Sequence, residues 1–277
     1  MFGFLTRYIR CWEQAGLLLR SPSVIAPFII FAALEFVVLV SLGAFSVPPL
    51  SVVMVPVVSL IGGEQALHYP MHMVLLPRLY NQLYLPLAVF VGFALFGWAV
   101  WLMMDHYERA GEDVPQRGQR RYRDLIPATM VVGFVFVTVV TAIQLAFSYV
   151  GAVVPIGLVG RAAWLIGMAL VLLFQALTIY SLYFLVTLTG NPIAAISQSI
   201  RFGRSHLTLT VSLVVTVFLI HLPINYLTQR ADRVVLKFNP ELVFVLLAAG
   251  IVLEIATSYF LFASTTSLAS GVKREGI

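Results

Sequence analysis

Charged residues are scarce in this sequence of 277 residues. Asp, Glu, Lys and Arg together make up 10% of the chain, whereas hydrophobic residues make up 60%. A soluble protein of this length needs far more polar surface to stay dispersed in water. The composition therefore excludes a soluble globular protein and predicts a protein that resides in a lipid bilayer.

Cysteine and catalytic motifs are also lacking. The single cysteine, Cys11, cannot form an internal disulfide, which excludes redox chemistry by a pair of thiols. The sequence contains no Gly-x-Ser-x-Gly, no phosphate-binding loop with its lysine, no Cys-x-x-Cys and no His-Glu-x-x-His. We therefore expect a protein that is not an enzyme and that holds no cofactor.

Six apolar runs are long enough to cross a membrane. A span needs about 20 apolar residues to cross roughly 30 Å of hydrocarbon, and it must be helical because lipid satisfies no backbone hydrogen bond. The predicted spans are 23–45, 85–104, 125–150, 162–188, 207–227 and 241–262. The sequence thus predicts an all-α polytopic membrane protein, with residues 1–277 in one transmembrane domain.

The basic residues indicate the orientation of these spans. Twelve of the 17 Lys and Arg residues fall on one side of the predicted spans, in four short segments. By the positive-inside rule this side is cytosolic, which places both termini in the cytosol. The basic residues lie at membrane boundaries and form no continuous stripe, so we expect anionic lipid headgroups as partners, and no nucleic acid.

Two segments on the predicted cytosolic side have the periodicity of helices that lie in the headgroup region. In residues 4–20, apolar residues recur at steps of three and four. Residues 191–206 open with Asn-Pro and show a similar alternation of faces. The polar faces carry four arginines, which we expect to contact lipid or, less commonly, a soluble partner protein: Arg7, Arg10, Arg201 and Arg204.

Two connecting segments leave alternatives open. The predicted cytosolic loop 105–124 is rich in acids first and in arginines second, so it is either a docking site for a cytosolic protein or a solvated turn. The predicted outer segment 47–83 has only Glu64 and Arg78 as charges, and its five prolines prevent one continuous helix. Such an apolar segment re-enters the membrane, caps the bundle, or packs on another subunit.

One segment carries a resemblance to a known family. Residues 190–206, Gly-Asn-Pro-Ile-Ala-Ala-Ile-Ser-Gln-Ser-Ile-Arg-Phe-Gly-Arg-Ser-His, run directly into an apolar stretch. This pattern resembles the membrane domain fused to some bacterial glycerophosphodiester phosphodiesterases, and related six-span bacterial inner-membrane proteins share the plan. The resemblance implies a six-span fold in a bacterial cytoplasmic membrane, and it brings no catalytic activity with it.

Two acidic residues lie near the middle of predicted spans. Glu35 in the first span and Glu254 in the last are each roughly 18 to 20 Å from where their helices enter the bilayer, at 1.5 Å per residue. An ionised carboxylate at that depth is unfavourable, and no Lys or Arg lies inside a span to pair with it. Either the two acids share a proton or bind a cation, as in a proton-coupled transporter, or each holds helices together as a neutral hydrogen-bonding group.

A weaker candidate site lies in the predicted outer segment. His68, Met71 and His72 offer ligands suited to Cu(I). Pro70 interrupts a helix there, however, and the segment supplies no thiolate, so an interfacial loop is the better interpretation.

Two functions follow as hypotheses. The first is a permease-type membrane subunit that handles a hydrophobic or amphipathic solute with partner proteins, with Glu35 and Glu254 lining the path. The second is a non-catalytic scaffold subunit of a larger membrane complex, or of a homo-oligomer, that uses residues 47–83 as its contact surface.

Overall fold

The predicted helical membrane fold is confirmed. The computed structural model describes residues 2–111, 121–153 and 158–271, and within these residues the chain forms helices and turns without a strand. Six helical segments are long and apolar enough to span a membrane: Pro22–Gly43, Met71–Arg109, Tyr122–Phe147, Ala162–Leu188, Leu207–Thr228 and Leu242–Ser270. The chain is therefore a multi-pass, all-α membrane protein.

Packing divides this predicted single domain into two compact units, each made of segments distant in sequence. Unit 1 comprises residues 1–27, 89–216 and 259–277, and unit 2 comprises residues 28–88 and 217–258. Unit 1 contains α1 (Phe2–Leu18), α5 (Phe93–Arg109), η3 (Tyr122–Leu125), α6 (Ile126–Val153), α7 (Leu158–Thr178), α8 (Ser181–Phe184), η4 (Leu185–Thr189) and α9 (Pro192–Ser205). Unit 2 contains α3 (Ser51–Gly62), η1 (Glu64–Leu67), α4 (Met71–Leu87) and α11 (Ala231–Lys237). Four elements contribute to both units: α2 (Pro22–Gly43), η2 (Ala88–Gly92), α10 (Leu207–Thr228) and α12 (Leu242–Ser270).

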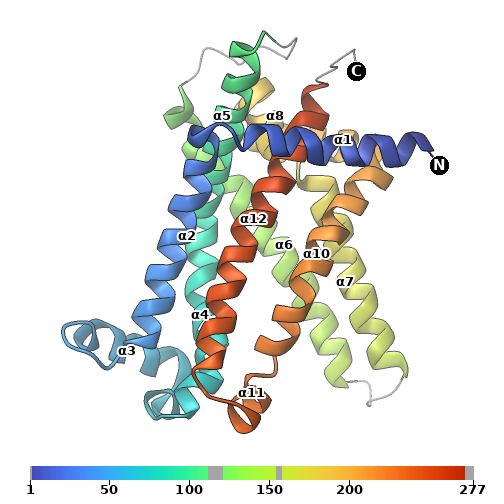
Figure 1. Ribbon diagram of the computed structural model, residues 1–277. Helices are drawn as coiled ribbons and strands as arrows, with labels where there is room; N and C mark the ends of the chain where they lie inside the picture. Colours follow the sequence, from blue (N-terminus) through green and yellow to red (C-terminus); the bar gives the residue numbers. More distant parts are fainter. Residues whose placement is uncertain (1, 112–120, 154–157, 272–277) are drawn as a thin grey trace. The chain divides into compact units, whose positions relative to one another are not determined.

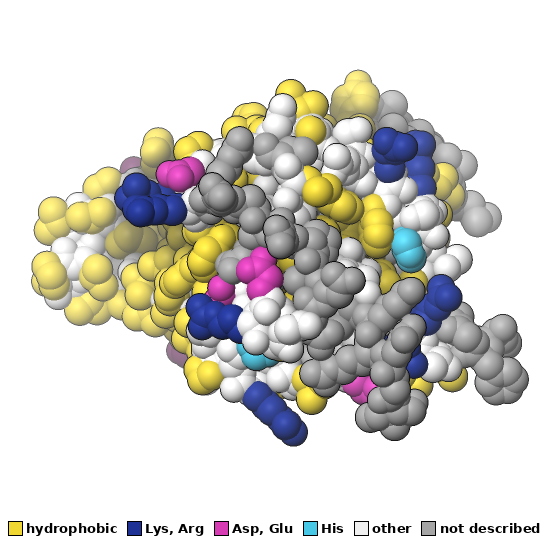
Figure 2. Space-filling model, turned by 90° about the horizontal axis from the view of Figure 1, so that it is seen from above, with side chains coloured by type: hydrophobic (Ala, Val, Ile, Leu, Met, Phe, Trp, Pro, Cys, Tyr) yellow, Lys and Arg dark blue, Asp and Glu magenta, His cyan; other side chains and the backbone are white. Residues whose placement is uncertain are grey.

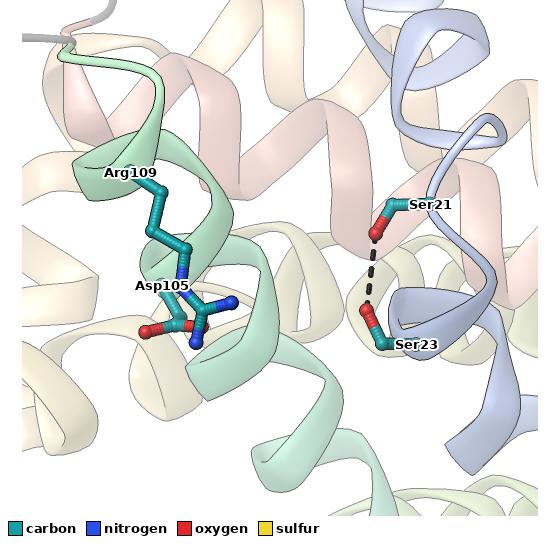
Figure 3. Close-up of polar contacts among 4 residues, drawn as sticks. All are labelled: Ser21, Ser23, Asp105 and Arg109. Atoms are coloured by element: carbon teal, nitrogen blue, oxygen red, sulfur yellow. Dashed lines mark hydrogen bonds and ion pairs between the residues drawn. The ribbon is translucent and has the colours of Figure 1, made fainter.

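Local sequence explains where several helices begin. The side chain of Asn191 accepts a hydrogen bond from the Ile193 amide at 3.0 Å, and Pro192 occupies the first turn of α9, as its missing N–H allows. Near the start of α2, the hydroxyls of Ser21 and Ser23 lie 3.0 Å apart (Figure 3). At α9 the Asn191 side chain thus satisfies one of the amide groups that the first helical turn leaves without a partner.

The second span begins earlier than the sequence predicts. The helix starts at Met71 and continues to Arg109, whereas the prediction begins at residue 85. Pro77 and Pro86 lie inside this helix, and a π-helical turn, η2, follows Pro86 directly. Proline removes an amide donor and crowds the carbonyl four residues earlier, so the wider turn accommodates the helix without ending it. Residues 71–83 therefore belong to a spanning helix, and only α3 and η1 form the separate apolar segment.

The end of this helix also shortens the predicted loop 105–124. Asp105 and Arg109 lie one turn apart on α5 and form an ion pair of 2.6 Å, with the guanidinium folded back toward the carboxylate (Figure 3). Four charged residues of the predicted loop lie outside the described part of the chain: Glu112, Asp113, Arg117 and Arg120.

In unit 1, α1 lies crosswise over the C-terminal part of α12 (Figure 1). The hydroxyls of Tyr259 and Ser264 donate to the carbonyls of Ala15 and Cys11 at 2.9 and 3.2 Å. Ser267 donates to the side chain of Gln14. The predicted interfacial helix is thus held to the bundle by polar contacts, while Arg7 and Arg10 stay exposed.

The helix α9 packs through a face of small residues, and not through the face that carries its isoleucines. Ala195, Ser199 and Gly203 are buried at four-residue steps, and Ser199 donates to the Leu177 carbonyl at 2.8 Å. Ile193 is exposed, as are the arginines of the opposite face. Small residues let α9 approach the backbone of α7 closely, which an isoleucine face would prevent.

Unit 2 has its own apolar core, to which α2, α4, α11 and α12 contribute. Figure 1 shows α2, α4 and α12 running beside one another in this unit, with α3 crosswise at their lower ends. The Tyr69 hydroxyl donates to Glu241 at 3.1 Å, which brings the starts of α4 and α12 to the same end of the unit. This end also receives the last turn of α10, because α11 connects α10 to α12 and packs against α4.

Candidate intramembrane carboxyl site

The structure brings the two predicted acids together in unit 2. Glu35 on α2 and Glu254 on α12 lie within electrostatic reach of each other, although 218 residues separate them in the chain. Tyr80 and Tyr84 on α4 interact electrostatically with both carboxyl groups. Four side chains from three helices thus form one polar cluster.

Glu35 is the most deeply buried member of this cluster. Its exposed fraction is 0%, and neither carboxyl oxygen has a hydrogen-bond partner among the described residues. An ionised carboxylate without a partner would be strongly unfavourable in such surroundings. Glu35 is therefore neutral in this arrangement and holds a proton.

Glu254 lies in a different environment. The Tyr84 hydroxyl donates to Glu254 Oε1 at 2.5 Å. The ring of Tyr84 is held by Phe31 and Tyr80, whose ring centroids lie 6.3 and 5.9 Å away. The Tyr84 hydroxyl thus fixes the Glu254 carboxyl group, whereas the Glu35 carboxyl group has no such partner among the described residues.

A cavity of about 160 Å³ reaches Glu254. Glu254 lies twelve residues after Leu242, about 18 Å from the start of α12 at 1.5 Å per residue. The lining begins near the ends of α4, α10 and α12 that lie together, and continues inward to Glu254. Its polar members are Tyr80, Asn81, Tyr84, His221, Asn225, Thr228, Gln229 and Glu254, and its other members are Pro77, Ile224, Leu247, Gly250 and Ile251.

His221 on α10 is part of this lining. Its Nε2 lies 2.7 Å from the hydroxyl of Thr257, which also lies 2.8 Å from the Leu253 carbonyl. The carbonyl only accepts, and the hydroxyl has one proton to give, so Nε2 of His221 donates to Thr257. The hydrogen bond fixes the ring at the edge of the cavity, one helical turn from Glu254.

The second predicted site is a packing contact instead. His72 is buried, with Nδ1 2.8 Å from the Ala66 carbonyl and Nε2 3.0 Å from the Leu42 carbonyl, and its ring stacks on Phe45. Both ring nitrogens are thus occupied, and this side chain ties the end of α2 to η1 and α4. His68 and Met71 are exposed, and no group of three His, Cys, Asp or Glu side chains among the described residues is arranged to hold a metal ion.

The remaining predicted contacts are exposed arginines of unit 1. Arg7 and Arg10 lie on α1, and Arg201 and Arg204 on α9, all exposed. On the face in Figure 2, the Lys and Arg side chains that are described lie among hydrophobic and uncharged ones. Exposed arginines of this kind suit contacts with anionic headgroups.

Reasoning from the sequence missed most of the cavity. Tyr80, Asn81 and Tyr84 fall in a segment predicted to lie outside the spans, and Asn225 lies in the last turn of a span, where polar residues are common and single out no site. The available signal was the spacing of Tyr80 and Tyr84, which places both rings on one face of a helix.

Comparisons with known proteins identify no relative of this chain. No family model matches the chain, and no curated protein or solved structure matches it either. The chemistry of the carboxyl site therefore carries the functional interpretation.

Proposed function

We propose that this chain is a permease-type membrane subunit that moves an amphipathic solute together with partner proteins. The observation that carries this proposal is a cavity that reaches from the helix ends of unit 2 to Glu254, beside the buried Glu35. Buried acids are rare inside membrane proteins and commonly mark ion or proton pathways. A merely structural role fits Glu35 poorly, because its carboxyl group bonds no described residue.

The pair supplies what a coupled transporter needs. Two carboxyl groups close together cannot both ionise easily, so the pair holds at least one proton. The proton leaves at little cost only when another positive charge arrives or when the site meets water. The site thereby links solute movement to proton movement.

The exposed arginines of α1 and α9 support the orientation that we propose for the subunit in its membrane. We place both termini, and these helices, at the cytosolic face of a bacterial cytoplasmic membrane, as the positive-inside rule and the family resemblance imply. There Arg7, Arg10, Arg201 and Arg204 contact anionic headgroups or a docked partner protein.

A scaffold role is the second candidate, and α3 is the observation that favours it. Val52, Val53 and Leu60 expose 77, 64 and 87% of their surfaces. An apolar helix with such a face contacts lipid or a further subunit. In that role α3 holds a partner, and the carboxyl pair is dispensable.

Chromosomal variants distinguish the two functions. Cells with Glu35→Gln or Glu254→Gln, and cells that lack the chain, are compared with wild type by mass spectrometry of their small-molecule content. We expect both glutamine variants to reproduce the solute changes of the deletion while the protein level stays normal. Glu241→Gln is the matched control, because Glu241 also bonds a tyrosine but does not line the cavity.

The scaffold predicts the reverse pattern. If the glutamine variants behave as wild type, and removal of residues 51–62 releases proteins that otherwise co-purify in fixed ratio in mild detergent, the permease proposal is wrong. A nucleotide-hydrolysing protein that co-purifies in fixed ratio supports the permease.

A further inference from the structure

The cavity of unit 2 has a carboxyl group at its inner end, and none of the described residues that line the cavity is Lys or Arg. This carboxyl group, of Glu254, accepts a hydrogen bond from the Tyr84 hydroxyl. A carboxylate away from bulk water is stable only with a compensating positive charge. We propose that the cavity binds a small primary ammonium ion with Glu254 as its counter-ion, an inference that rests on the proposed function and names its solute class.

Tyr80 is an independent observation that points to a ligand with N–H donors. This side chain is 7% exposed, lines the cavity, and has a buried hydroxyl without a hydrogen-bond partner among the described residues. A buried hydroxyl without a partner is unfavourable. An ammonium group between Glu254 and Tyr80 donates to both, because a primary ammonium carries three donors and a hydroxyl oxygen accepts.

The size and the walls of the cavity limit the size and polarity of the rest of the ligand. A cavity of about 150 Å³ accommodates a molecule of about six heavy atoms, the size of benzene, and this one measures about 160 Å³. Ile224, Leu247 and Ile251 supply apolar walls for a short alkyl chain. A bare metal cation fits this site poorly, because it would leave the apolar walls facing water and needs about six oxygen ligands.

Binding displaces a proton from Glu254. The titratable groups that face Glu254 are Glu35 from α2, Tyr80 and Tyr84 from α4, and His221 from α10. When the ammonium ion enters, the Glu254 carboxyl group gives its proton to water in the cavity and becomes the counter-ion, while the buried Glu35 keeps its proton. The net charge of the site stays constant, so one ammonium ion exchanges for one proton.

The test measures binding of n-butylammonium to the purified chain in detergent by isothermal titration calorimetry. We expect saturable binding with release of protons, whereas n-butanol, of the same size but uncharged, and Na⁺ do not bind. Glu254→Gln is expected to weaken binding by about tenfold or more, since it removes a charged hydrogen-bond acceptor. Tyr80→Phe is expected to weaken it about threefold to tenfold through loss of one neutral acceptor.

Matched controls separate a loss of the site from a loss of folding. Tyr183→Phe removes another buried hydroxyl without a described partner, but Tyr183 does not line the cavity, so binding should stay unchanged. Butanol or Na⁺ binding as tightly as butylammonium overturns the ammonium proposal, and so does a Glu254→Gln variant that binds normally. If wild type does not bind butylammonium but the cellular test still requires Glu35 and Glu254, the ligand class is wrong and the permease stands. Binding without any cellular effect of the glutamine variants contradicts the permease instead.

Discussion

Tyr84 and Tyr69 donate the same kind of hydrogen bond in two different surroundings. Tyr84 bonds Glu254 inside a span, and Tyr69 bonds Glu241 at the surface. We expect Tyr84→Phe to lower the free energy of unfolding by about 0.5 to 1.5 kcal/mol, because the lost bond is part-buried inside a span. Tyr69→Phe should change it by less than about 0.5 kcal/mol, as is usual at exposed positions. Thermal unfolding in one detergent measures both, and equal losses would show that the surroundings of Tyr84 add nothing to the strength of its bond.

Cys11 is predicted to be slow to react. Its thiol is 5% exposed, and burial raises the pKa of the Cys11 thiol. Since the thiolate is the reactive form, labelling of the folded protein by a maleimide at pH 7 should be far slower than labelling after denaturation in SDS. The rate should keep rising at pH values where an ordinary thiol has already reached its maximum. Arg7→Cys combined with Cys11→Ala provides an exposed control on the same helix, and equal rates for the two positions would place Cys11 at the surface.

Glycine has opposite roles in the two amphipathic helices. A Cβ at Gly203 of α9 would lie 3.1 Å from the Leu177 Cα and 3.2 Å from the Ala176 carbonyl oxygen, whereas a Cβ at Gly16 of α1 meets nothing within 4 Å. We expect Gly203→Ala to lower the free energy of unfolding by about 1 kcal/mol through overpacking against backbone. Gly16→Ala should raise it by about 0.5 to 1 kcal/mol, because alanine loses less entropy in a helix. Unfolding of both variants under one condition tests the contrast, and a stabilising Gly203→Ala would show that α9 packs less closely on α7.

The sequence predicts the helices better than it predicts their faces and ends. Hydropathy and length identify all six spans, because lipid demands about 20 apolar residues in a helix. The sequence does not predict that the second spanning helix begins at Met71, because prolines that normally interrupt a helix are accommodated there by a π-helical turn. The sequence also does not predict the packing face of α9, because that packing depends on the small size of Ala195, Ser199 and Gly203.

The carboxyl site is likewise predicted only in part: the sequence identifies its acids but not how they are arranged. Glu35 and Glu254 are visible in the sequence because charge is rare in a span, but their proximity depends on how α2 and α12 pack. The tyrosines and the amide side chains of the cavity carry no charge, so hydropathy passes over them. A site built from helices far apart in sequence becomes apparent only in three dimensions.

The proposed orientation makes a further prediction for the complete chain in its membrane. In a Cys11→Ala background, Arg204→Cys should react with a membrane-impermeant maleimide only after the cells are opened, whereas Glu64→Cys should react in intact cells. Both positions are exposed, so access depends on the side of the membrane. The reverse labelling pattern would invert the orientation. Labelling of both positions from one side would contradict the count of spans between them.

The two acids of the carboxyl site lie in the first and the last of the six spanning helices, which has a consequence for biogenesis. A ribosome delivers the spans in order, so Glu35 enters the bilayer with α2, Tyr84 follows with α4, and Glu254 arrives last with α12. Until then Glu35 is an isolated acid in a nascent protein, and such an acid is unfavourable in hydrocarbon. Packing of α12 therefore completes the surroundings of α2, and a nascent chain that stops before α12 keeps Glu35 without the neighbours that it has in the folded protein.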